Sequence, residues 1–369
     1  MNYLEQIETP AVVIDMQQVR ANLKAMAEHA NRCGCALRPH IKTHKIPEFA
    51  RLAMDFGACG ITCAKVSEAE VMADGGIGDI FIAYPLVGDF RIRRAAALSR
   101  RVNRLIVAVD SLAGAIALSE AAVRESIAFE VRLEVDTGLK RTGAAPERAE
   151  ELALAVAALP GIALTGIFTF RGLVLDGKST LDNAEAGRQE GRTLAALAER
   201  LRSRGLGIRD VSGGSTPTGR YVAEVDGVTE IRPGTYIFND WMQVLEHACA
   251  PGDCAATVLA TVVSVSGTGY AVIDGGSKTF ATDFAVNAEP FRYPGYAVLA
   301  DDPSLVLVRV NEEHGMLTSP KGAADLVVGD TVRLIPVHVC STVNLHNHVW
   351  LLEDGRLRKV PVAARGMLV

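Results

Sequence analysis

The chain has 369 residues, of which 49% are hydrophobic and 22% are charged, as is usual for a soluble globular protein. Its length suits one large domain with a second domain attached. The net charge of -5, with no basic block longer than Arg91–Arg94, argues against nucleic-acid binding. The N-terminal end lacks a signal pattern, and no apolar run approaches about 18 residues, so we expect a cytoplasmic protein that does not enter membranes.

Short apolar runs alternate with segments of helical periodicity through the first part of the chain. Continuous apolar strands between amphipathic helices predict a parallel sheet with helices over its outer face. Eight strands is the number of a (β/α)8 barrel, so we predict an α/β protein with a TIM-like barrel; a doubly wound open sheet is the alternative. The predicted strands are 35–41, 59–64, 79–84, 104–110, 128–136, 162–170, 208–213 and 229–234.

The pattern changes near Leu245. Runs rich in Val, Leu and Thr follow one another, separated by Gly, Asp and Pro turns without long helices. We therefore predict a barrel domain over residues 9–244 and an all-β domain over residues 245–369, with residues 1–8 as a candidate addition to the second domain. The predicted strands of the second domain are 257–265, 270–274, 304–310 and 331–336.

The first predicted strand ends in Arg38-Pro-His-Ile-Lys42, where an apolar run stops at a lysine. In (β/α)8 barrels the chemistry lies at the C-terminal ends of the strands. A lysine amine at that place can form a Schiff base with a carbonyl cofactor such as pyridoxal phosphate. The alternative is that Lys42 is a solvated charge at a strand end. Several other predicted strands also end in charged or hydroxyl side chains, which favours a functional lysine.

The seventh predicted strand ends in a turn that contains two glycines. Backbone amides of such a turn can approach a phosphate closely, and hydroxyl groups beside them can add hydrogen bonds. Tyr236, after the eighth strand, can bring its phenol to the same phosphate. A plain loop is the alternative reading of the turn. The candidate phosphate ligands of the turn are Ser212, Gly213, Gly214, Ser215 and Thr216.

Arg141 lies in the turn that follows the fifth predicted strand, within Asp136-Thr-Gly-Leu-Lys-Arg141. Its guanidinium could donate a hydrogen bond to an oxygen of a cofactor ring. The alternative is a structural salt bridge between Arg141 and Asp136. The two interpretations are compatible.

His338 and Cys340 suggest a metal site in the second domain. If the segment is extended, the two side chains face the same side, and an imidazole with a thiolate is a plausible pair of zinc ligands. Core packing is the alternative. Four of the eight histidines fall between residues 314 and 348, which makes this region dense in candidate ligands. The other six of the seven cysteines are irregularly spaced and indicate buried free thiols rather than a zinc ribbon.

Taken together, these motifs resemble the D-threonine aldolase and D-serine dehydratase family, in which an alanine-racemase-like barrel is joined to a β domain. The resemblance covers nearly the whole chain, and its specificity comes from the motifs in combination. They are Thr9-Pro-Ala-Val-Val-Ile-Asp15, Arg38 to Lys45, Gly60 to Glu70, Glu134 to Gly138, Ser212 to Thr218, Arg232 to Tyr236, Glu312 to Gly315 and His338-x-Cys340.

The resemblance implies that Lys42, rather than Lys45, carries pyridoxal phosphate, with His40 and Arg141 beside it. It also implies that Gly213 to Thr216 and Tyr236 hold the phosphate, that His338 and Cys340 bind a divalent metal, and that the protein is a homodimer with its active site near the subunit interface. The expected substrates are D-β-hydroxy-α-amino acids. We expect aldol cleavage to glycine and an aldehyde; dehydration to a keto acid and ammonia, and racemisation, are the alternatives. A non-catalytic pyridoxal phosphate carrier is a further, less favoured alternative.

Two departures from the family pattern bear on this choice. His-x-Cys resembles the zinc site of the dehydratase branch, whereas aldolases of the family commonly show His-x-Asp, so zinc is expected before manganese or magnesium. Phe170 and Arg171 stand where relatives often have a tyrosine or threonine followed by a histidine. We hypothesise that Arg171 binds an extra carboxylate of an acidic substrate such as 3-hydroxyaspartate. The alternative is that Arg171 pairs with a nearby aspartate.

Overall fold

The computed structural model describes residues 6–266, 269–322 and 326–369, and it contains two compact units. The barrel unit comprises Lys24–Lys42, Ile46–Gly234 and Gly366–Val369. The sheet unit comprises the described residues up to Leu23, then Thr43–Lys45 and the described part of Thr235–Arg365. The chain therefore enters the sheet unit for three residues directly after Lys42.

The barrel unit is built on eight parallel strands in the order β2-β11-β10-β7-β6-β5-β4-β3. The two outer strands of that order, β2 and β3, are joined through a parallel bridge between His40 and Thr62, where the Thr62 amide donates to the Pro39 carbonyl at 2.8 Å. All eight predicted strands are confirmed. Their bounds are β2 Ala36–Leu37, β3 Ile61–Cys63, β4 Asp79–Pro85, β5 Arg104–Val109, β6 Phe129–Glu134, β7 Ile162–Phe168, β10 Asp210–Gly213 and β11 Glu230–Ile231.

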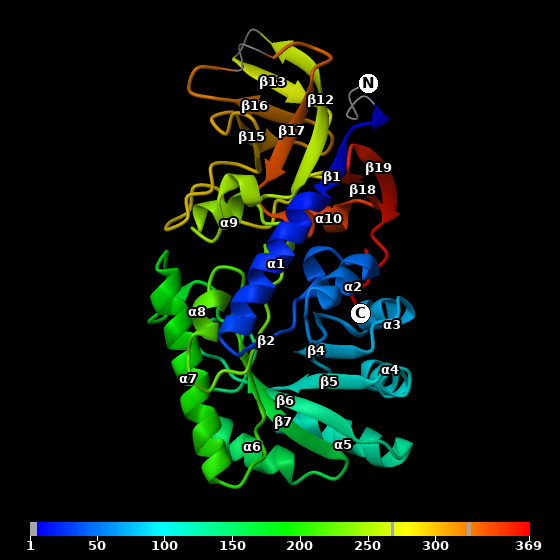
Figure 1. Ribbon diagram of the computed structural model, residues 1–369, viewed down its shortest axis with the longest axis vertical. Helices are drawn as coiled ribbons and strands as arrows, with labels where there is room; N and C mark the ends of the chain where they lie inside the picture. Colours follow the sequence, from blue (N-terminus) through cyan, green and yellow to red (C-terminus); the bar gives the residue numbers. More distant parts are fainter. Residues whose placement is uncertain (1–5, 267–268, 323–325) are drawn as a thin grey trace. The chain divides into compact units, whose positions relative to one another are not determined.

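Helices alternate with these strands, as the periodicity predicts. Figure 1 shows α4, α5 and α6 beside strands β5 to β7, with which they are in contact. The strands between them are buried along most of their length, which explains their continuous apolar sequences. The helices are α1 Met16–Arg32, α2 Pro47–Asp55, α3 Val66–Asp74, α4 Asp89–Ser99, α5 Leu112–Glu125, α6 Ala149–Ala157, α7 Asn183–Ser203 and α8 Gly219–Ala223, and a small hairpin consists of β8 Val174–Leu175 and β9 Lys178–Ser179.

A buried ion network holds the barrel strands together from within. The Glu230 carboxylate of β11 accepts hydrogen bonds from Arg38 at 2.7 Å, from Arg132 of β6 at 2.5 Å and from the Ser212 hydroxyl of β10 at 2.6 Å. Arg38 also reaches Asp79 of β4 at 2.5 Å. Burial alone would raise the pKa of Glu230, but the two arginines lower it well below its usual range. The network therefore links five of the eight strands around one ionised carboxylate.

The sheet unit contains a nine-stranded sheet in the order β13-β16-β15-β14-β17-β12-β1-β18-β19. Because β13 pairs with β12 as well as with β16, six of these strands close on themselves, and β1, β18 and β19 extend from β12. The strands are β1 Ala11–Asp15, β12 Ala256–Ser266, β13 Tyr270–Ile273, β14 Ala297–Leu299, β15 Val306–Val310, β16 Gly315–Thr318, β17 Thr331–Pro336, β18 His348–Glu353 and β19 Arg356–Pro361. Two short helices, α9 Trp241–Leu245 and α10 Val339–Leu345, complete the unit.

The ends of the chain contribute to both units. β1, which lies inside the predicted barrel range of residues 9–244, pairs antiparallel with β12 and parallel with β18 in the nine-stranded sheet. Residues 6–8 belong to the sheet unit, and residues 1–5 of the candidate addition lie outside the described residues. The last four residues, Gly366–Val369, belong to the barrel unit, where Ser67 donates to the Val369 carbonyl at 2.5 Å.

The Glu230 network leads to a stability prediction. Glu230→Gln leaves two buried guanidinium groups without their shared carboxylate, and breaking a buried ion pair in this way costs about 3–5 kcal/mol. We expect a loss of that size in the free energy of urea unfolding at pH 7. The matched control is Glu353→Gln, which breaks the exposed pair with Arg20 and should cost no more than about 1 kcal/mol. Equal losses of unfolding free energy in the two variants would contradict the proposed stabilising role of Glu230.

Candidate active site

Lys42 follows β2 and lies in a single 3₁₀ turn, Ile41–Thr43. The predicted strand over residues 35–41 is thus shorter in the structure, where only Ala36–Leu37 form the ladder. The Lys42 amide donates to Nδ1 of His40 at 3.2 Å, and the His40 amide donates to the Pro233 carbonyl at 3.0 Å. The backbone on which Lys42 sits is therefore fixed by hydrogen bonds at the end of the strand that the Glu230 network anchors.

Lys42 and Arg141 share the ring of Phe170. The Lys42 Nζ atom lies 5.3 Å from the ring centroid, and the Arg141 Cζ atom lies 5.1 Å from it. Among the described residues, neither cation has an ion-pair partner within 4.0 Å. Each cation is attracted to the face of the ring, whereas the two like charges repel each other. The arrangement suits an anionic ligand, as the sequence predicts for this end of the barrel.

The turn before Arg141 is held by Asp136. Its Oδ1 atom accepts from the amides of Gly138 at 2.9 Å and Lys140 at 3.0 Å, a turn in which the aspartate caps its own backbone. The alternative of a structural salt bridge between Asp136 and Arg141 is not found in the described part of the chain. The Asp136 carboxylate thus stabilises the turn, and the Arg141 guanidinium lies near the Phe170 ring.

Two backbone amides of the glycine turn after β10 already donate hydrogen bonds within the protein. The Gly214 amide donates to Oε1 of Glu190 at 2.9 Å, and the Ser215 amide donates to the Thr218 hydroxyl at 3.0 Å. Gly214 has a φ of +80°, and a Cβ there would lie 2.8 Å from the Gly219 Cα, so only glycine fits. The Ser212 hydroxyl belongs to the Glu230 network, and Tyr236 lies in the sheet unit with an exposed fraction of 3%. Phosphate binding by this turn stays a prediction.

Glu190 is a buried acid that the sequence analysis missed. It lies on α7 with no exposed surface, and burial raises its pKa to about 7 against the lowering effect of the Gly214 amide and nearby arginines. The available signal was its position: Ala186, Glu190, Leu194 and Leu197 recur at helical spacing on the buried face of the helix. A carboxylic acid on an apolar stripe is a candidate for a perturbed pKa.

His338 and Cys340 are brought together, but not in the way predicted. The prediction of an extended segment is wrong, because His338 caps the N-terminus of α10 and Cys340 occupies the second position of that helix. The helix starts here because the Val339 amide donates to Asp240 at 2.9 Å, and Asp240 lies 99 residues away in the chain. Burial lowers the pKa of the His338 imidazole, but hydrogen bonds to Asp283 and then to the Cys340 side chain raise it, so the imidazole and the thiol do adjoin.

Hydroxyl groups surround the Cys340 sulfur. Its Sγ atom lies 3.2 Å from the Thr43 hydroxyl and 3.6 Å from the Thr235 hydroxyl. Thr43 is the residue that follows Lys42 in the chain, and it is fully buried in the sheet unit. The residue directly after the predicted cofactor lysine therefore contacts Cys340, a predicted metal ligand.

Asp240 is a second buried acid that the sequence analysis missed. Its two oxygens accept from the amides of Gln243 and Val339, each at 2.9 Å, so one carboxylate caps both α9 and α10. Burial raises its pKa to about 8, an effect that neighbouring His338 reduces. Because both oxygens are engaged by amides, Asp240 is placed to hold the helix that carries the metal pair.

The His338–Cys340 pair suits a metal that is only partly held by the protein. Within the described ranges, no group of three or more His, Cys, Asp or Glu side chains is placed to bind one ion together. A nitrogen and a sulfur donor are the ligand types that zinc prefers, and catalytic zinc keeps positions open for water or substrate. The donor types are compatible with a metal whose coordination is completed from outside this pair, and metal binding by His338 and Cys340 stays a prediction.

Arg171 lies beside the turn that carries Arg141. A Cβ at Gly138 would lie 3.7 Å from the Arg171 Nε atom, and the Arg171 Nη2 atom donates to Oε1 of Gln189 on α7. The side chain is 3% exposed, and burial lowers its pKa. Among the residues that the structure describes, its Nε has no hydrogen-bond partner and its charge no carboxylate within 4.0 Å. The alternative of a direct pair with an aspartate is thus not seen; Asp176 is instead bound to Gln189.

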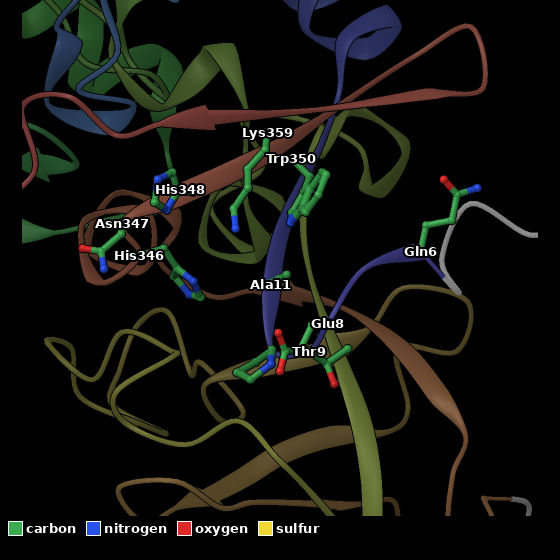
Figure 2. Close-up of a pocket in the computed structure, with 10 residues that line it drawn as sticks. Gln6, Glu8, Thr9, Ala11, His346, Asn347, His348, Trp350 and Lys359 are labelled. Atoms are coloured by element: carbon green, nitrogen blue, oxygen red, sulfur yellow. The ribbon is translucent and has the colours of Figure 1, made fainter.

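A polar pocket lies elsewhere in the sheet unit. Figure 2 shows it between the segment that leads into β1 and the β18–β19 hairpin, with Glu8, His348, Trp350 and Lys359 among its lining residues. His346 and His348, two of the histidines that crowd this part of the sequence, line this pocket. It contains none of the predicted cofactor or metal ligands.

The comparison with known families follows the same division of the chain. The alanine racemase N-terminal domain matches residues 14–240. The chain belongs to this family. A second match, to a putative serine dehydratase domain, covers residues 255–352. The family resemblance expected from the motifs is thereby confirmed.

Full-length relatives include enzymes of two reaction types. A D-threonine aldolase of Arthrobacter sp. is 33% identical over 98% of this chain and 94% of its own length. A D-threo-3-hydroxyaspartate dehydratase of Delftia sp. (strain HT23) is 34% identical over 91% of this chain and 92% of its own. The crystal structure of D-threonine aldolase from Filomicrobium marinum matches with a TM-score of 0.87 and 30% identity, covering 98% of this chain and 97% of that one.

Within the described ranges, no helix combines the length and apolar character that crossing a bilayer requires.

The buried acid Glu190 leads to a pH prediction. Its folded-state pKa of about 7 exceeds the unfolded value of about 4.3, so the folded state binds the extra proton and loses stability as the pH rises between these values. Glu190→Gln removes this titration and keeps an oxygen for the Gly214 amide. We expect the variant to gain up to about 3 kcal/mol relative to the wild type at pH 8 and little at pH 4.5.

Thermal melts across this pH range provide the measurement. Glu185→Gln, at an exposed acid on the same helix, is the control and should show no such trend. A difference between Glu190→Gln and the wild type that is constant with pH would contradict the raised pKa.

Proposed function

We propose that the protein is a pyridoxal phosphate- and metal-dependent lyase that acts on D-β-hydroxy-α-amino acids, cleaving them to glycine and an aldehyde. The observation that carries the proposal is the placement of Lys42 and Arg141 at one aromatic ring, with no carboxylate of the described residues within 4.0 Å of either cation. The cofactor has an aldehyde that an amine can bind and a ring oxygen to which a guanidinium can donate. Relatives that are aldolases and dehydratases, similar over nearly the whole chain, support the same reaction class.

Lys42 would hold the cofactor through its amine, and Arg141 would donate to an anionic oxygen of the bound molecule. Pyridoxal phosphate, when bound, supplies an electron sink for the charge that develops at the substrate α-carbon. Phe170 presents an apolar ring close to both cations. The Gly213–Thr216 turn and Tyr236 are proposed to bind the phosphate, and His40 holds the Lys42 backbone.

His338 and Cys340 would hold a divalent cation, which polarises the β-hydroxyl of the substrate when bound. We propose zinc rather than manganese or magnesium, because the pair includes a sulfur donor. The N-terminus of α10, which the Asp240 carboxylate holds in place, would present the His338 imidazole and the Cys340 thiol to the cation.

Dehydration to a keto acid and ammonia is the second candidate, and the same residues serve it. Lys42 would then remove the α-proton, and a cation held by His338 and Cys340 would supply Lewis-acid assistance for the loss of the hydroxyl group. The His-x-Cys pair and the lack of an imidazole at positions 170 and 171 favour this candidate. Racemisation needs no metal and would persist in a chelator.

Product analysis distinguishes these reactions. D-threonine, D-serine and D-threo-3-hydroxyaspartate are incubated with the enzyme and pyridoxal phosphate after chelation, with and without added Zn²⁺ or Mn²⁺. Metal-dependent release of glycine and aldehyde is the expected result. Ammonia with a keto acid would assign the dehydratase reaction. Metal-independent loss of optical rotation without either product set would contradict the lyase proposal.

We further propose a homodimer with the active site near the interface, and a cytoplasmic location. The family resemblance supports the first of these. All seven cysteines are free thiols, as is usual in a reducing compartment, and this supports the second.

The assignment of Lys42 yields a direct prediction. Lys42→Ala should lose both the visible absorbance of bound pyridoxal phosphate and at least about 10³-fold in kcat, because no other amine is placed at Phe170 among the described residues. Lys45→Arg is the control at the neighbouring rival lysine, since arginine keeps the charge but cannot bind an aldehyde in this way. Loss of the absorbance in Lys45→Arg together with its retention in Lys42→Ala would contradict the assignment.

The proposal for Arg171 also predicts a selective effect. If its buried guanidinium binds a second carboxylate of the substrate, Arg171→Ala should lower kcat/KM for D-threo-3-hydroxyaspartate about 10–100-fold more than for D-threonine. Arg188→Ala, at an exposed arginine of α7 paired with Glu224, is the control and should affect neither substrate. Equal losses for the acidic and the neutral substrate in Arg171→Ala would rule out carboxylate binding.

A further inference from the structure

The imidazole of His338 is held from one side by Asp283. The His338 Nδ1 atom lies 2.9 Å from Oδ1 and 3.1 Å from Oδ2 of Asp283, so both carboxylate oxygens face the same ring nitrogen. The Ser341 hydroxyl donates to Oδ2 at 2.7 Å. Asp283 is thus restrained by a second bond from the helix that carries Cys340.

The segment that carries Asp283 is fastened to α10 at several points. The Ala281 amide donates to the Thr342 hydroxyl at 3.1 Å, and the His346 Nε2 atom lies 3.1 Å from the Thr279 carbonyl. Thr342 also donates to the His338 carbonyl at 2.8 Å. The carboxylate, the imidazole and the helix N-terminus therefore form one hydrogen-bonded frame.

The contribution of this contact to stability is small. The side chain of His338 is 26% exposed and that of Asp283 is 49% exposed, and ion pairs at such sites contribute no more than about 1 kcal/mol. The contact instead fixes the orientation of the His338 ring. In a metal-bound imidazole, the ring nitrogen that donates to a carboxylate carries the proton, and the other nitrogen, on the opposite side of the ring, is the one that binds the metal.

We propose that Asp283 is a positioning residue for the metal pair: it holds the proton on Nδ1 of His338 and thereby presents Nε2, with the Cys340 sulfur, to a divalent cation. The inference rests on the proposed metal role of His338 and Cys340. Outer carboxylates that orient ligating imidazoles in this way raise metal affinity about 10–100-fold.

Zn²⁺ affinity tests the role without reference to catalysis. The full chain is titrated with Zn²⁺ in competition with a chromophoric chelator, as the wild type and as Asp283→Ala, Asp283→Asn and His338→Ala. We expect His338→Ala to abolish specific binding and Asp283→Ala to weaken it about 10–100-fold. Asp283→Asn should weaken binding less, because its amide oxygen can still accept from Nδ1. Asp301→Asn, at an exposed aspartate of the same unit paired with Arg333, should bind as the wild type does.

Histidine ¹⁵N NMR provides the readout that a merely structural role would not change. With Zn²⁺ bound, the wild type should show the His338 proton on Nδ1, and Asp283→Ala should weaken or shift that Nδ1–H signal. Zn²⁺ affinity within twofold of the wild type in a folded Asp283→Ala protein would overturn the proposal. Absence of specific Zn²⁺ binding by the wild type would overturn it together with the metal pair, while the product analysis would still judge the lyase reaction.

Discussion

The buried carboxylate of Glu230 is the constraint on which the barrel end of the site depends. The strands β2 and β11 contribute only two residues each to the parallel ladder, so their backbone bonds alone hold little. Arg38 and Arg132 converge on Glu230 and tie these short strands to β4, β6 and β10. Since Lys42 follows β2 by only a few residues, its place at the rim of the barrel derives from this ionised core.

The cations inside the barrel and those at the C-terminal strand ends differ in their direct partners. Inside the barrel, Arg38 and Arg132 each have a carboxylate within hydrogen-bond distance. At the strand ends, Lys42 and Arg141 share the Phe170 ring, and Arg171 is buried against the amide of Gln189. A folded protein that leaves cations in such surroundings gains when an anion binds, which is the physical basis for a site that accepts a phosphorylated cofactor and a carboxylated substrate.

The sequence predicts the barrel strands well because strands buried on both faces have continuous apolar sequences, a local signal. It predicts the site less completely because the deciding contacts are distant in the chain. The extended arrangement of His338 and Cys340 is wrong since Asp240, 99 residues away, starts a helix there. The amide of Gly214 is engaged by Glu190 of α7, and β1 pairs within the other sheet; neither partner can be found from periodicity alone.

Reductive trapping of the cofactor tests the central claim most directly. The protein loaded with pyridoxal phosphate is treated with borohydride, which fixes the cofactor to the lysine that holds it, and the modified peptide is identified by mass spectrometry. The account predicts a single modified residue, Lys42. Modification of Lys45 instead, or a protein that carries no cofactor after loading and reduction, would contradict it.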